Sequence, residues 1–121
     1  MERPYRHIDV ERRNDVFCVR FCSQRMEEDV IGDMADELTS LITDLGCRKM
    51  ALSLGPKEMD VLYSVFLAKL LMVQRRLAEK GGALKLCDAS PQTIEVFEAC
   101  RLKSHFHFVP DEASALAALA K

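Results

Sequence analysis

The sequence lacks the residue patterns that would indicate binding to nucleic acid or a passage through a membrane. Acidic and basic residues are interspersed at a formal net charge of -2, and aromatic residues make up 7% of the chain. No basic stripe or RNA-binding aromatic signature is present, which argues against nucleic acid as a partner. The longest apolar run, residues 61–73, contains a serine and a lysine and is too short to cross a bilayer. Residues 1–13 contain no apolar stretch resembling a signal peptide, so we expect a cytoplasmic protein.

Cysteine pairs of the metal-binding or redox type are also missing. The cysteines are scattered and none forms a C-x-x-C pair, so zinc-ribbon and thioredoxin-like spacings are absent. Cys18 and Cys22 share one face of a predicted strand, but no second pair of ligands accompanies them. We therefore expect no metal site and predict free thiols, buried or half-buried, at Cys18, Cys22, Cys47, Cys87 and Cys100.

No set of residues suited to catalysis can be assembled from the sequence. His105 and His107 share one face of the predicted last strand, but without further ligands they are interpreted as a solvent-side pair. The segment "GPKEMD" (55–60) lacks the G-K-[ST] ending of a phosphate-binding loop. The acids of "MEEDVIGDMADE" indicate the solvated face and first turn of a helix rather than a cation site. We expect no enzymatic activity and no cofactor.

The spacing of apolar residues predicts an α/β fold in one domain, residues 1–121. The turn-forming pair Asn14-Asp15 separates two strands that form an N-terminal hairpin. Helix and strand then alternate, which implies a mixed, mostly parallel sheet of about five strands with about four helices. Helix ends are predicted from Gly46, from the pair Gly81-Gly82, and from Ser90 as a cap followed by Pro91. The predicted strands are 5–11, 16–22, 49–54, 83–87 and 105–109, and the predicted helices are 27–45, 64–80, 91–102 and 110–121.

This element order resembles that of the STAS domain, the family of anti-sigma factor antagonists that is also found in stressosome proteins and anion transporters. The stretch "RRLAEKGGALKLCDASPQTIEVFEACRL" (75–102) resembles the family's glycine pair, fourth strand, L-C-x-x-S-P turn and third helix. The stretch "HFHFVPDEASALAAL" (105–119) resembles its last strand and helix. The resemblance implies a STAS-like sheet and a bacterial regulator of transcription that binds an anti-sigma factor or a kinase-like regulatory protein.

Members of the family that act as switches share a D-S-S-G-L-G type motif at the start of the second helix, and its second serine is phosphorylated by the partner kinase. Counted back from Gly81, that serine falls on Val65, while Ser64 matches the first serine and Tyr63 replaces the acid. Ser53 stands where the third strand often carries an aspartate. The resemblance thus implies that the usual acceptor is absent and Ser64 caps the helix. A register shifted by one residue would instead make Ser64 the phosphorylation site.

The second helix also presents a predicted partner surface, opposite the stripe that faces the sheet. Val65, Lys69, Met72 and Arg76 recur at helical spacing and would place two apolar side chains beside two cations. We expect partner binding through Ser64, Val65, Phe66, Lys69, Met72 and Arg76. Two alternatives stay open. The first is a structural STAS domain that self-associates as a homodimer or serves as a scaffold in a signalling assembly, and the second is a STAS domain that senses a small ligand or nucleotide.

Overall fold

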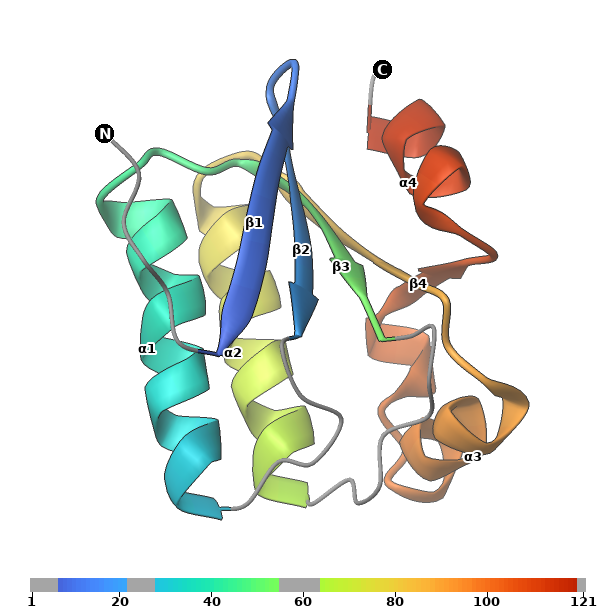
Figure 1. Cartoon of the computed structure of the whole chain (residues 1–121). Helices are drawn as coiled ribbons and strands as arrows, with labels where there is room; N and C mark the ends of the chain where they lie inside the picture. Colours follow the sequence, from blue (N-terminus) through green and yellow to red (C-terminus); the bar gives the residue numbers. More distant parts are fainter. Residues whose placement is uncertain (1–6, 22–27, 55–63, 120–121) are drawn as a thin grey trace.

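A computed structural model describes residues 7–21, 28–54 and 64–119 of the chain (Figure 1). They form a five-stranded mixed sheet with the order β1-β2-β3-β4-β5. β1 and β2 are antiparallel and all other neighbours are parallel, as the predicted fold requires. The strands are β1 (Ile8–Arg13), β2 (Val16–Phe21), β3 (Lys49–Ser53), β4 (Ala83–Cys87) and β5 (His107–Val109). The helices are α1 (Glu28–Thr43), α2 (Ser64–Glu79), α3 (Pro91–Ala99) and α4 (Glu112–Leu119), with a 3-10 turn η1 (Lys103–His105).

Helices cover both faces of the sheet. α1 and α2 lie side by side on one face, and α4 lies on the other (Figure 1). Alternate residues of each strand point to opposite faces, so the sheet contributes to two cores. The larger core lies under α1 and α2 and includes Phe17, Val19 and, from α3, Phe97. The smaller core lies under α4 and contains Val16, Cys18, Ala51, Cys87, Ala115 and Leu119. No helix among the described residues is long and apolar enough to cross a membrane.

The glycine pair after α2 has two separate roles. Gly81 adopts φ +77°, the left-handed conformation that ends many helices. The Gly82 N–H donates to the Leu77 carbonyl at 2.8 Å, which closes the last turn of α2. A Cβ atom on Gly82 would lie 1.8 Å from the carbonyl oxygen of Arg48. Only glycine therefore allows β4 to begin this close to the chain entering β3.

The first strand lies further along the chain than predicted. It ends at Arg13 rather than Glu11, because the turn at Asn14-Asp15 places Arg13 opposite Val16. The charged residues near its end remain acceptable in a strand at the edge of the sheet, whose outer side faces solvent. The predicted start of this strand, residues 5 and 6, lies outside the described residues, as does the predicted end of the second strand at Cys22.

Two other boundaries correct the sequence-based prediction. The last strand spans only His107–Val109, and His105 lies in η1, so the two histidines do not share a strand face. Phe106 between them caps the end of η1, and its side chain is buried. The first helix ends at Thr43, and Leu45 beyond it is 40% exposed rather than part of the buried stripe.

Candidate functional site

The candidate site begins at the first turn of α2. The described part of α2 begins at Ser64, and the cap role predicted for its side chain lies outside what the structure describes. Val65 is 38% exposed, and it and Leu45 are the exposed large apolar side chains of the part of the chain that the structure describes. An apolar side chain therefore lies at the solvent surface at the beginning of this helix.

The rest of the predicted stripe follows Val65 along the outer side of α2. Lys69 and Met72 are half-buried and Arg76 is exposed. Met72 packs against the edge of the main core, so its remaining surface is what a partner could contact. Together with two further exposed residues of the same helix, these side chains are called here the α2 outer face. It consists of Val65, Ala68, Lys69, Met72, Arg75 and Arg76.

Phe66 is not part of this surface, and its assignment as a partner-binding residue was wrong. Its side chain is 1% exposed, and its ring centroid lies 5.7 Å from that of Phe21 in the main core. The helical repeat explains the burial, since Phe66 shares a side of α2 with Leu70 and Val73, which are also buried. Phe66 therefore anchors the start of α2 to the sheet.

The cations of α2 have no ion-pair partner among the residues that the structure describes. Lys69, Arg75 and Arg76 form no ion pair within 4.0 Å among the described residues, and the first turn of the helix contains no acid. Cations elsewhere do form such pairs: Arg13 with Glu11, Arg20 with Glu112, Lys49 with Asp15, and Lys103 with Glu98. Within the described part of the chain, the α2 outer face therefore combines exposed apolar surface with cations that form no ion pair.

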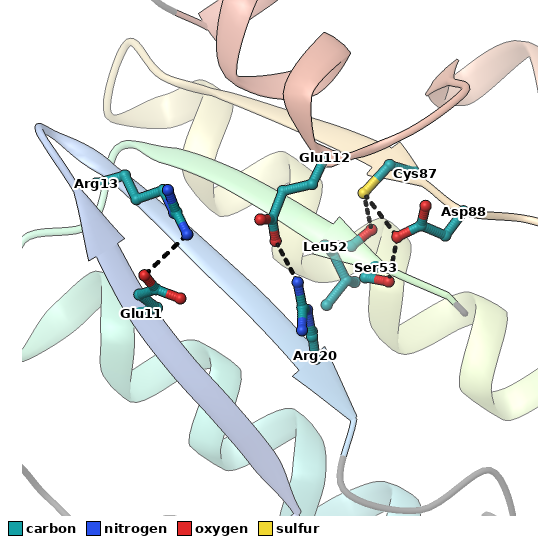
Figure 2. Close-up of polar contacts among 8 residues, drawn as sticks. All are labelled: Glu11, Arg13, Arg20, Leu52, Ser53, Cys87, Asp88 and Glu112. Carbon is teal, nitrogen blue, oxygen red and sulfur yellow. Dashed lines mark hydrogen bonds and ion pairs between the residues drawn. The ribbon is translucent and has the colours of Figure 1, made fainter. Parts of the chain in front are cut away.

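A polar cluster that the sequence did not reveal joins the ends of β3 and β4. Ser53 Oγ donates to Asp88 Oδ2 at 2.7 Å, and Cys87 Sγ lies 3.7 Å from the same oxygen (Figure 2). Burial raises the pKa of the Cys87 thiol to about 12, and the Asp88 charge adds to this effect. The thiol is thus held in its neutral, unreactive form. In the sequence, the only indication of this cluster is that Ser53 and Asp88 stand at the ends of two predicted buried strands. The sequence does not specify that the two side chains meet.

An ion pair on the face of the sheet that α4 covers connects β2 to the start of α4. Arg20 of β2 lies 3.4 Å from Glu112 at the first residue of α4, while Arg13 and Glu11 pair within β1 at 3.1 Å (Figure 2). Pairs this exposed contribute little stability, because water and salt screen them. The two pairs do balance the charges of Arg13 and Arg20 on the hairpin. The cations of the α2 outer face have no such partner among the described residues.

The structure provides no support for a metal centre. Among residues 7–21, 28–54 and 64–119, no group of three His, Cys, Asp or Glu side chains lies close enough to bind an ion. Cys18, Cys47 and Cys87 are free and buried, as predicted, but Cys100 is free and exposed, contrary to the prediction. Cys22 lies outside the described residues. His107 contacts Lys85 on the neighbouring strand rather than His105.

Comparison with known proteins identifies the fold. No protein-family model and no curated protein sequence matches the chain. Solved structures do match, including an anti-sigma-factor antagonist (STAS) domain protein from Planctomyces limnophilus, with 23% identity and a TM-score of 0.81 over 94% of this chain and 98% of that one. An anti-sigma factor antagonist from Mycobacterium paratuberculosis has 19% identity and a TM-score of 0.79, over 94% and 93% of the two chains. The Bacillus cell fate determinant SpoIIAA in its phosphorylated form has 14% identity and a TM-score of 0.68, over 92% and 97%. The chain therefore has the STAS fold, as the resemblance in its sequence implied.

Proposed function

We propose that this chain, over residues 1–121, is a cytoplasmic regulatory domain that acts by binding another protein. The fold is that of anti-sigma factor antagonists, so an anti-sigma factor or a kinase-type regulator is the partner class we propose. A fold alone does not fix a function, and the proposal therefore depends on a particular surface of this chain. That surface is the α2 outer face.

The exposure of Val65 carries the proposal. An apolar side chain at the first turn of α2 loses contact with water when a partner covers it, and this burial favours association. Lys69, about one turn further along the helix, and Arg76 flank it with positive charge. Exposed apolar surface bordered by charge is the arrangement expected of a protein-binding site.

We also propose that this domain is not switched by phosphorylation at the usual position. By the register that the family resemblance implies, Val65 occupies the acceptor position, and valine has no hydroxyl to receive a phosphoryl group. Ser64 then serves as the helix cap, where a side-chain oxygen accepts from a backbone N–H of the first turn. Binding to the partner would be constant rather than relieved or induced by a dianion at the helix N-terminus.

Affinity capture from the source cell tests the proposal with a matched pair of variants. Val65→Asp introduces a charge on the α2 outer face, and Leu45→Asp introduces the same charge at a side chain of similar exposure, 40% against 38%. We expect Val65→Asp to lose a regulatory protein that the wild type and Leu45→Asp both retain. Capture that is equal for all three chains would contradict docking through α2.

Phosphate mapping on the captured wild-type protein tests the second part. We expect no phosphate on Ser64 or Ser53. Phosphate on Ser64 would show that the register is shifted by one residue and that the switch is retained. The two parts are independent, because the capture experiment reports the surface and the mapping reports its regulation.

A further inference from the structure

A shallow hollow runs along α2 and overlaps the α2 outer face. The hollow has a volume of about 460 Å³ and is lined by Ala68, Leu71, Met72, Arg75, Arg76 and Glu79. It exists because the small side chain of Ala68 lies between longer ones. Leu71 and Met72 are half-buried against the core and provide an apolar floor. The hollow thus offers room for side chains of a partner element lying along α2.

The charges around the hollow are mostly positive. Arg75 and Arg76 lie on its rim, and Lys69 lies two turns before Arg76, about 10 Å away along the helix axis. None of the three forms an ion pair among the described residues, and Glu79 is the only acid in α2. Because the chain as a whole is slightly acidic, at -2, this excess of positive charge is a local property of one helix.

The neighbouring helix limits how a partner can lie. α1 packs beside α2, exposes Asp33 and Asp36, and contains no basic residue. An acidic partner is attracted by α2 and repelled by α1, so it must follow α2 rather than cross both helices. A basic partner would be directed to α1, where no exposed large apolar side chain of the described residues lies.

We infer that the hollow binds an amphipathic helix whose apolar stripe is flanked by acidic residues. The inference rests on the proposed function and specifies the chemistry of the partner element at the same helix. Apolar side chains of that helix would cover Met72 and Leu71, and its carboxylates would pair with Lys69, Arg75 and Arg76. An amphipathic helix binds in a groove through apolar side chains that recur every three or four residues. The pairing of its carboxylates with the cations of α2 would set the orientation of the bound helix.

A synthetic helical peptide of about 18 residues, five turns, serves as the probe. It carries leucine on one side and glutamate beside it, and a control peptide has lysine in place of every glutamate. Binding is followed by fluorescence anisotropy at low and high salt. We expect the acidic peptide to bind, the basic one not to bind, and binding to weaken as salt screens the charges. No binding of the acidic peptide, or equal binding of both peptides, overturns the inference.

Charge reversal locates the binding site. The double substitution Arg75→Glu with Arg76→Glu is expected to lower the affinity for the acidic peptide at least about tenfold, which corresponds to about 1.4 kcal/mol of binding free energy. Arg13→Glu with Arg20→Glu makes the same change in net charge at exposed cations on the face of the sheet opposite to α2, and is expected to change affinity less than about twofold, or about 0.4 kcal/mol. If both double variants lose the same affinity for the acidic peptide, the peptide is attracted by the net charge of the chain alone, and the inference is overturned. Circular dichroism and a thermal melt establish that each variant is folded.

The outcomes separate this inference from the proposed function. If Val65→Asp loses the captured partner while the Arg75→Glu, Arg76→Glu variant retains it, the acidic-helix inference fails and the proposed function stands. If Val65→Asp retains every partner while the acidic peptide still binds at Arg75 and Arg76, the surface binds acidic helices but the proposed function fails.

Discussion

Ser53 and Asp88 join the carboxyl ends of β3 and β4 through a hydrogen bond of 2.7 Å between the serine hydroxyl and the carboxylate. Ser53 is 1% exposed and Asp88 is half-buried, so this contact is partly shielded from water. Asp88 holds its backbone at φ +60°, a conformation that non-glycine residues rarely adopt. The hydrogen bond and the unusual backbone together fix the point where the chain leaves the sheet toward α3.

Replacing Asp88 should separate these two effects. Asp88→Gly removes the carboxylate but suits the backbone, whereas Asp88→Ala removes the carboxylate and keeps the strain of φ +60°. We expect Asp88→Ala to lower the free energy of unfolding by about 1 kcal/mol more than Asp88→Gly does. Urea unfolding of the two variants measures the difference. Equal stability would mean that this backbone conformation is relaxed in the variants.

Alanine should have opposite effects at two glycines. At Gly82 its Cβ would lie 1.8 Å from the Arg48 carbonyl oxygen, so Gly82→Ala must displace backbone and should be strongly destabilising, by several kcal/mol. At Gly32, within α1, no atom lies within 4 Å of the added Cβ. Gly32→Ala should therefore raise the free energy of unfolding by about 0.5–1 kcal/mol through its better helix propensity. Urea unfolding checks both, and a destabilised Gly32→Ala would contradict the open space at that position.

Adjacent residues at the start of α2 should respond differently to substitution. Phe66→Ala removes a ring that packs in the core against Phe21 and should cost about 3–5 kcal/mol of stability. Val65→Asp changes an exposed position and should alter stability by less than about 1 kcal/mol. Thermal and urea unfolding give both values. A large loss at Val65 would show that its side chain serves the fold rather than a surface.

Stability should decrease at alkaline pH because two thiols are buried. Burial raises the pKa of Cys47 and of Cys87 from 9.0 to about 12 in the folded chain. Below pH 9 both states keep these protons; above it the unfolded chain loses them first, so the free energy of unfolding falls as pH rises. The slope approaches about 1.4 kcal/mol per pH unit for each thiol. Cys47→Ala should reduce the slope measured between about pH 9 and pH 11, which lies within the range where this linkage acts.

Cys100 provides the control for that measurement. Its thiol is exposed in the folded chain, unlike that of Cys47, so Cys100→Ala removes a cysteine without removing a buried one. The slope of Cys100→Ala should match that of the wild type. If Cys47→Ala also leaves the slope unchanged, burial of the thiols does not govern the alkaline transition.

The elements with strong periodicity were predicted well from the sequence. β4 matches its predicted limits, and α2 ends at Glu79, one residue before the predicted end, because the glycine pair separates the two elements. Phe66 was misplaced since a residue at the border of the buried stripe is positioned by how the helix rotates against the sheet, which only packing decides. His105 was misplaced because an alternating pattern of five residues also fits a short turn followed by a strand.

Contacts between distant residues could not be read from the sequence. Ser53 and Asp88 are separated by 35 positions, and their hydrogen bond depends on the register of β3 and β4. Helical spacing likewise does not specify that Lys69, Arg75 and Arg76 form no ion pair within 4.0 Å among the described residues, because ion pairs depend on the packing of separate elements. The exposed stripe of α2, by contrast, followed from helical spacing alone and agrees with the exposure of Val65 and Arg76.

The central claim, that a partner docks on the α2 outer face, is tested most directly by the affinity of the captured partner for purified variants. Isothermal titration of wild type, Val65→Asp and Leu45→Asp gives three dissociation constants under the same conditions. The account predicts that Val65→Asp weakens binding at least about tenfold, or about 1.4 kcal/mol, while Leu45→Asp stays within about twofold of the wild type. Equal affinities for Val65→Asp and the wild type would contradict it.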